Sequence, residues 1–235
     1  VELFNTAPTP VKIGTVTINP DGTLTFTPVP LFNGPVNFEY TVSDGTATDV
    51  GKVNIVVDNV NDPPDARDDV IRFTEDTVTA FDPRSNDIDV DGDPLTITAI
   101  NGTPISLGSA PIVLINGTIQ MVAGATPGTT QLSFTPNDNF NGTQTFNYTI
   151  SDGRGGFDNA TVTLQGVPVN DPPAAQDVVQ TTQQNVAVTV AAAQLGFSDI
   201  DGDTLAAVRI DTLPAAGSLQ LNGTPIAAGA LISIA

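Results

Sequence analysis

The sequence predicts an all-β chain made of repeated two-sheet sandwich modules. The first observation is a repeat, because Asn-Asp-Pro-Pro begins at Asn61 and again at Asn170, a spacing of about 110 residues, which is the size of one ordinary domain. The second is composition, since 21 glycines and 19 prolines suit many short strands joined by turns. The third is alternation: between the turns, large apolar residues recur at every second position, as the core of a sandwich requires.

Each Asn-Asp-Pro-Pro segment marks a joint between modules. Two successive prolines have a fixed φ angle and no amide donor, so neither a sheet nor a helix can continue through them. We therefore divide the chain into the C-terminal part of a module at 1–60, a complete module at 61–169, and the N-terminal part of a third, variant module at 170–235. Both ends lie inside a module, so we expect the chain to be a piece of a longer protein.

The first module is predicted from four alternating runs. These runs, which are separated by turn sequences, are 11–18, 23–27, 38–42 and 53–57. The second half of the middle module repeats the pattern, so that Phe38 and Tyr40 return as Phe146 and Tyr148. Because such residues recur at period two, they lie on one face of a strand, and we expect that face to point into the core.

The other segments are less regular. Strands in the first half of the middle module are predicted at 70–74, 77–81 and 95–100. The stretch 102–128 is loop-rich, and we expect one or two short strands in it. In the third module, the alternation from Val186 to Val190 favours a strand. No segment shows a convincing helical period.

Composition excludes several classes of function. Seven basic residues against 26 acidic ones give a formal charge of −19, so nucleic acid and anionic membrane surfaces are poor partners and cations are good ones. The chain has no Cys and no His, which excludes disulfides, thiolate metal sites and Ser-His-Asp chemistry. No apolar run approaches the ~20 residues that span a bilayer, so direct membrane insertion is not expected.

The acidic turn from Asp89 to Asp93 is the clearest candidate site. Carboxylates about 5 Å apart repel each other by roughly 1 kcal/mol per pair in water, and Arg84 is the only basic residue nearby in the sequence. Such a cluster is either a solvated turn or is neutralised by a hard cation with oxygen ligands, Ca²⁺ before Mg²⁺. An EF-hand is not expected, because the later Glu and the flanking helices are missing.

Antiparallel topology predicts which loops meet at a joint. In a seven-stranded sandwich, the loops after the second and sixth strands both return to the upstream end. Asp89 and Asp91 belong to the first of these loops and Asp152 to the second, so all three should converge on the joint at 61–62. The turn that contains Asp138 should face the downstream joint.

Several motifs resemble a known family. The segment 89–100 resembles the cadherin Asp-x-Asp loop that leads into a strand, and Phe-x-Tyr-Thr-Val-Ser-Asp-Gly, ending at Gly45, resembles the cadherin strand that ends in a ligand Asp. With Asn-Asp-Pro-Pro, Thr-Glu-Asp at 74–76 and Phe-Asn-Gly-Thr at 140–143, the set is most similar to bacterial cadherin-like repeats of large RTX-type surface adhesins. The resemblance covers essentially the whole chain and implies tandem Ig-like, cadherin-like Greek-key β-sandwich modules.

The resemblance also implies a calcium site at each joint. The ligands that it implies at the first joint are Asn61, Asp62, Asp89, Asp91 and Asp152. Those that it implies at the second joint are Glu75, Asp138, Asn170, Asp171, Asp199 and Asp201. Pro63 and Pro172 stand where the cadherin linker has a further Asn, so we expect fewer ions per joint or weaker binding. A solvated acidic turn, and for Asp152 an Asp-Gly hairpin turn, are the open alternatives.

On this basis we expect calcium-rigidified extender modules of a bacterial cell-surface or secreted adhesin. The expected partners are calcium ions, neighbouring modules of the same chain and a cell-surface glycan or protein, and the chain is expected to be an extracellular monomer. The alternative is a carbohydrate- or protein-binding β-sandwich module that uses the 102–128 loops. We do not expect an enzyme, because glycoside hydrolysis by paired carboxylates needs a cleft that nothing in the sequence supplies.

Overall fold

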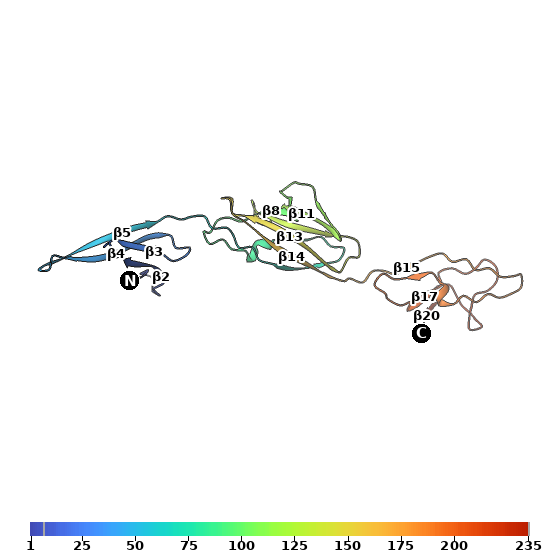
Figure 1. Ribbon diagram of the computed structural model, residues 1–235. Coiled ribbons are helices and arrows are strands. Elements are labelled where there is room, and N and C mark those ends of the chain that lie inside the picture. The colour runs from blue at the N-terminus through green and yellow to red at the C-terminus, as the bar shows by residue number, and fades with distance from the viewer. Residues whose placement is uncertain (7, 235) are drawn as a thin grey trace.

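The computed structural model describes residues 1–6 and 8–234. Three β-rich segments follow one another in an extended row and are joined by short irregular stretches of chain (Figure 1). In the described part of the chain, the regular structure consists of strands and two 3₁₀ turns without any α-helix, which confirms the predicted all-β class. None of the described residues belongs to a helix with the length and apolar character needed to cross a membrane.

The middle segment is a two-sheet sandwich. Its elements are β6 (Asp69–Thr74), β7 (Thr79–Phe81), η1 (Pro83–Asn86), β8 (Thr96–Ile100), β9 (Thr103–Pro104), β10 (Ile112–Leu114), β11 (Gly117–Ala123), β12 (Thr130–Pro136), β13 (Thr143–Ser151) and β14 (Phe157–Val167). One sheet has the order β10-β11-β12-β7 and the other β6-β14-β13-β8-β9. Only β6 and β14 pair in parallel among these strands; the remaining pairs are antiparallel.

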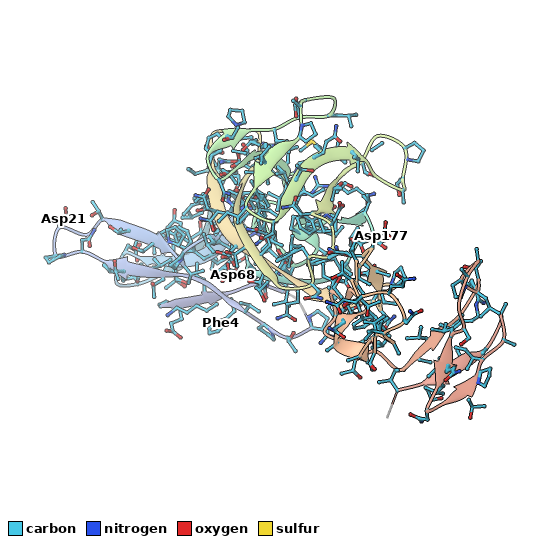
Figure 2. The ribbon with its side chains drawn as sticks, turned by 90° about the vertical axis from the view of Figure 1, so that its right-hand side faces the viewer. Phe4, Asp21, Asp68 and Asp177 are labelled. Carbon is cyan, nitrogen blue, oxygen red and sulfur yellow. The ribbon has the colours of Figure 1, made fainter. Side chains whose placement is uncertain are left out.

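The core lies between these two sheets, where side chains fill the space in Figure 2. Tyr148, Leu132 and Phe134 are fully buried. Phe73 meets Phe134 edge to face, with ring centroids 5.0 Å apart, a favoured aromatic geometry. Because side chains on a strand alternate, β13 buries Phe146 and Tyr148 on one face, as the sequence predicts.

The first segment lacks such a core. Its strands are β1 (Glu2–Phe4), β2 (Lys12–Ile18), β3 (Leu24–Pro28), β4 (Gly34–Ser43) and β5 (Thr48–Val57), arranged as a three-stranded sheet β1-β2-β3 and a long hairpin β4-β5. Val16 and Val36 are its only buried hydrophobic residues among those that the structure describes. Tyr40 corresponds to the fully buried Tyr148 but is 42% exposed. In the middle module, β6 and β8 flank the pair β14-β13, whereas among the described residues β4 and β5 pair only with each other. The same strand pattern therefore buries a core in the larger sheet but not in the isolated hairpin.

The third segment consists of short pairs of strands. Its elements are β15 (Ala174–Ala175), η2 (Ala192–Gln194), β16 (Phe197–Ser198), β17 (Ala207–Arg209), β18 (Gln220–Leu221), β19 (Thr224–Pro225) and β20 (Leu231–Ser233). β15 pairs with β16, β17 with β20 and β18 with β19, each antiparallel. Within residues 8–234, no hydrophobic side chain after Leu164 is buried.

Two of the strand predictions are wrong. The stretch 102–128 contains three strands rather than one or two, and the seven-residue β11 lies between β10 and β12 and buries Ile119 and Met121. Conversely, the stretch from Val186 to Val190 is irregular and exposed. A strand is stabilised by cross-strand contacts with its neighbours in a sheet. β11 makes such contacts with β12, whereas the described residues provide no neighbouring strand for the valines at 186, 188 and 190.

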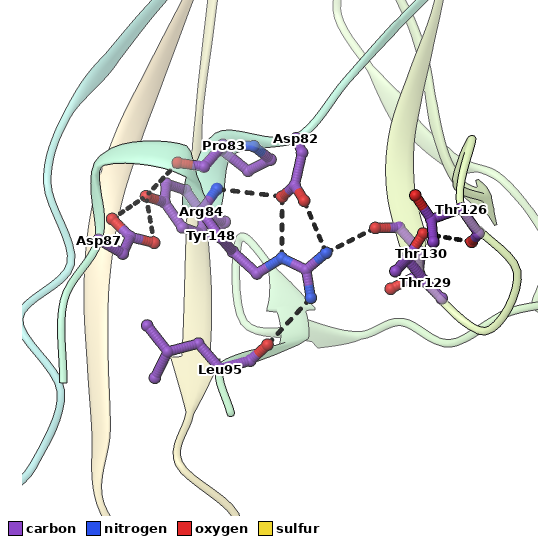
Figure 3. Close-up of polar contacts among 9 residues, drawn as sticks. All are labelled: Asp82, Pro83, Arg84, Asp87, Leu95, Thr126, Thr129, Thr130 and Tyr148. Carbon is purple, nitrogen blue, oxygen red and sulfur yellow. Dashed lines mark hydrogen bonds and ion pairs between the residues drawn. The ribbon is translucent and has the colours of Figure 1, made fainter. Parts of the chain in front are cut away.

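A half-buried arginine connects the two sheets of the middle module (Figure 3). Arg84 donates to Asp82 from Nε and Nη2, each at 2.8 Å. It also donates from Nη1 to the carbonyl of Leu95 at 2.9 Å and from Nη2 to that of Thr130 at 2.6 Å. Leu95 immediately precedes β8 and Thr130 begins β12, so one side chain links both sheets. Arg84 therefore acts in the fold and not as a counter-ion of the acidic turn.

Candidate metal sites at the two joints

The acidic turn of the middle module lies between η1 and β8. Asp89 Oδ1 accepts the amide N–H groups of Asp91 at 2.9 Å and of Asp93 at 3.2 Å. Gly92 has a φ angle of 77°, which glycine adopts without strain and which closes the turn. As a result, each of the three carboxylates offers an oxygen within 4.8 Å of the others.

The linker of the first joint meets this turn and the loop after β13. The Asp62 amide donates to Asp91 Oδ2 at 2.7 Å, and Asn59 Nδ2 donates to Asp91 Oδ1 at 3.0 Å. Asn61 Nδ2 donates to Asp152 Oδ2 at 2.7 Å. The predicted convergence of the two loops on residues 61–62 is thus confirmed, whereas their role as metal ligands stays a prediction.

These hydrogen bonds lower the pKa values of two carboxylates at the first joint, those of Asp91 and Asp152. The amide of Asp62, followed by the side chain of Asn59, holds the pKa of Asp91 below its usual range. The side-chain amide of Asn61 is the main cause that lowers the pKa of Asp152. Hydrogen bonds to the charged form of a carboxylate favour that form, so both side chains stay ionised at neutral pH.

The predicted set for the first joint lacks two residues that the structure places there, Asn59 and Arg154. Arg154 Nη2 lies 3.0 Å from Asp93 Oδ1, and the Asp93 side chain is only 7% exposed. In the folded chain, the basic residue that pairs with this turn is Arg154, whereas Arg84, which is nearer in the sequence, binds Asp82. Arg154 is distant in the sequence, but the hairpin between β13 and β14 brings it to the turn.

The second joint repeats the backbone geometry of the first. Asp199 Oδ1 accepts the amides of Asp201 at 2.9 Å and Asp203 at 3.2 Å, the same distances as at the first joint. The Asp171 amide donates to Asp201 Oδ2 at 2.7 Å, as the Asp62 amide does to Asp91. The repeated sequence therefore builds the same linker-to-turn contact twice.

Glu75 adds a buried carboxylate to the second joint. It follows β6, is 2% exposed, and accepts the amide of Val169 in the linker. Glu75, Asp171 and Asp201 each offer an oxygen within 4.8 Å of the others. Burial, together with the charges of Asp76 and Asp201, raises the pKa of Asp171. This joint therefore concentrates negative charge from the middle module, the linker and the third segment.

Two predicted residues stand apart from this cluster. Asp138 lies exposed in the turn after β12 and is not among the carboxylates that meet at the second joint. The Asn170 side chain donates to the carbonyl of Asp171 at 3.0 Å. The amide of Asn139 donates to Asp76 Oδ1 at 2.8 Å. The hydrogen bond to Asp76 thus holds the turn at 137–139 close to Glu75. The Asp138 carboxylate, however, does not belong to the cluster of Glu75, Asp171 and Asp201.

Several buried oxygens at the joints lack a donor. Among the described residues, Asn61 Oδ1, Asp89 Oδ2 and Asp93 Oδ2 at the first joint, and Asp171 Oδ2 at the second, have no hydrogen-bond partner. Buried polar groups are normally satisfied, and a hard divalent cation coordinates carboxylate and amide oxygens of this kind. The residues present therefore fit a calcium ion at either joint, and the donor set contains no soft ligand.

Comparisons with known proteins agree with this organisation. A model of the bacterial Ig domain matches residues 61–165, and a model of a cadherin-like domain matches residues 5–58. Both kinds of domain are β-sandwiches, so the predicted fold class is confirmed. No curated protein matches the sequence.

Solved structures of low sequence identity are also similar. Protocadherin gamma C5 EC1-3 is 12% identical with a TM-score of 0.46, and the match covers 95% of this chain and 75% of that one. The endo-fucoidan hydrolase MfFcnA4 of glycoside hydrolase family 107 is 20% identical with a TM-score of 0.31, and the match covers 72% of this chain. The human desmocollin-1 ectodomain is 12% identical with a TM-score of 0.33, and the match covers 74% of this chain. The chain spans 23% of the hydrolase and 35% of the desmocollin ectodomain.

Proposed function

Since bacterial Ig-like and cadherin-like domains stand in tandem in this chain, we propose that it is a calcium-rigidified extender of a bacterial adhesin of the RTX type. The observation that carries this proposal is the contact between an acidic turn and the preceding linker at both joints. At the second joint, carboxylates of the middle module, the linker and the third segment also meet, in Glu75, Asp171 and Asp201. Bacterial Ig and cadherin-like domains are typical of extracellular proteins, and the proposed location is the cell surface or the secreted fraction.

The chain itself prepares each joint for a cation. The amides of Asp62 and Asp171 hold the acidic turns against the linkers, so the carboxylates are gathered before any ion binds. Gathered carboxylates repel one another by roughly 1 kcal/mol per pair in water. Calcium, when bound, would neutralise this repulsion and tie the acidic turn to its linker, and at the second joint also to Glu75 of the middle module. A joint that flexes without calcium would then become stiff with it.

Calorimetry of unfolding tests the proposal directly. Extracellular modules bind calcium with Kd values of about 10⁻⁴–10⁻³ M. Calcium at about 10 mM should therefore stabilise the folded chain by roughly 1.5–3 kcal/mol relative to EDTA, because a ligand selective for the folded state shifts the equilibrium. Asp91→Asn and Asp201→Asn should each remove part of this gain, since each takes one carboxylate from one joint.

The control is Asp21→Asn, which removes an equal charge from an exposed turn of the first segment. It should leave the calcium-dependent stabilisation unchanged. Small-angle scattering of the same samples should show a longer and stiffer particle in calcium than in EDTA. Identical melting and scattering in both buffers would contradict the proposal and favour passive, solvated turns.

A further inference from the structure

The two joints share the hydrogen bonds within the acidic turn and from the linker amide, but they differ in their basic side chains. Arg154 pairs with Asp93 at the first joint. Among the ion pairs of the described residues, none involves Glu75, Asp171, Asp201 or the rest of the second acidic turn. The first joint therefore carries a positive side chain inside its acidic cluster, and the second does not.

The hairpin between β13 and β14 fixes the position of Arg154. Asp152 Oδ1 accepts the Arg154 amide at 2.7 Å, and the same carboxylate accepts the amide of Gly156. The backbone of Arg154 is thus attached to a carboxylate that the linker also holds through Asn61. A side chain that starts here reaches Asp93 without any rearrangement of the loop.

The pair between Arg154 and Asp93 is half-buried and incomplete. The Asp93 side chain is 7% exposed, while that of Arg154 is 62% exposed. Asp93 Oδ1 receives the guanidinium at 3.0 Å, but Asp93 Oδ2 has no partner among the described residues. Asp93 Oδ2 is therefore free to bind a cation. The neighbouring guanidinium of Arg154 is largely exposed and can turn towards solvent.

We propose that Arg154 is a resident counter-ion that lowers the calcium affinity of the first joint below that of the second. This inference rests on the function proposed above. A fixed positive charge beside a cation site opposes a second cation through ordinary Coulomb repulsion, and it stabilises the carboxylates when no ion is bound. The second joint, with three clustered carboxylates and no such pair, takes calcium at lower concentration. The chain then stiffens in two steps, the second joint before the first.

Calorimetric titration of the full chain with calcium chloride tests this order. The wild type should show two classes of sites, and Asp201→Asn should remove the tighter class while Asp91→Asn removes the weaker one. Arg154→Gln should tighten the weaker class about threefold to tenfold, the size expected for loss of one charge near a partly exposed site. Its folded state can be checked in EDTA, where unfolding should stay cooperative.

Lys52→Gln is the matched control, because it removes the same net charge from the exposed side of β5. Lys52 lies roughly 20 Å from the linker along the strand, well beyond the screening length of about 10 Å at 0.1 M salt. Three results would overturn this inference while leaving the proposed function intact. They are equal affinities at the two joints in the wild type, no tightening in Arg154→Gln, and equal tightening in Lys52→Gln. The absence of any calcium binding in all variants would overturn the proposed function together with it.

Discussion

Replacing Arg84 with methionine is expected to lower the free energy of unfolding of the middle module by about 3–5 kcal/mol. Methionine keeps most of the apolar stem but removes the charged donors to the carbonyls of Leu95 and Thr130. A hydrogen bond from a charged group contributes about 1.5–3 kcal/mol, and a buried acceptor left without a donor adds a desolvation cost. The Asp82 side chain is 42% exposed, so water can replace the hydrogen bonds that Asp82 accepts from Arg84.

The loss should be specific to this position. Arg72→Met makes the same chemical change on the exposed side of β6 and should alter stability by less than about 0.5 kcal/mol. Urea unfolding of the full chain, followed by the transition of the middle module, measures both variants. If Arg84→Met unfolded within about 1 kcal/mol of the wild type, the link between the two sheets would contribute little to the fold.

The largest pH-dependent effect is expected from Asp69, at the start of β6. Asp69 is 9% exposed, and its Oδ2 has no hydrogen-bond partner among the described residues. Burial, opposed in part by Tyr148 and reinforced by the charges of Asp87, Asp68 and Asp82, raises the pKa of Asp69 from 3.8 to about 6. The folded state therefore disfavours the charged form of this carboxylate.

The sign of the effect follows from proton binding. Between pH 3.8 and about 6, the folded chain binds the Asp69 proton more tightly than the unfolded chain does. Below pH 3.8, Asp69 is protonated in both states and does not lower the free energy of unfolding. As the pH rises from 3.8 to about 6, the free energy of unfolding falls. At about 1.4 kcal/mol per pKa unit, the full loss is about 3 kcal/mol. Asp69→Asn, which cannot ionise, should be more stable than the wild type by up to this amount at pH 8.

Urea unfolding at several pH values between about 4 and 8 checks this prediction. The stability difference between Asp69→Asn and the wild type should grow up to about pH 6 and then level off. Asp177→Asn is the control, since Asp177 is exposed and belongs to the third segment, away from Asp69. A difference that stayed constant over the whole range would show that Asp69 is not the source of the pH dependence.

Features that depend on local pattern and on topology could be predicted from the sequence. The alternation of Phe146 and Tyr148 gives the buried face of β13 because successive side chains on a strand point to opposite faces. The contact between Asn61 and Asp152 follows from counting strand directions in an antiparallel sandwich. Neither inference needs any knowledge of how individual side chains pack.

Features that depend on tertiary pairing could not be predicted in this way. β11 is a full strand because β12 pairs with it along its whole length, whereas the alternating valines at 186–190 pair with no strand in the part of the chain that the structure describes. The reach of Arg154 to Asp93 depends on the direction of a long, flexible side chain. Arg84 is closer than Arg154 to the acidic turn in the sequence, but its donors bind Asp82 and the carbonyls of Leu95 and Thr130.

The parallel pairing of β6 with β14 has a mechanical consequence. β6 is the first strand of the middle module and β14 the last, and they run side by side from Val162 opposite Asp69 to Val167 opposite Thr74. Tension along the chain pulls β6 towards the upstream joint and β14 towards the downstream joint. The two strands are then sheared past each other, and the hydrogen bonds between them are loaded together instead of being broken one by one. The module therefore resists extension along the line in which its neighbours are attached.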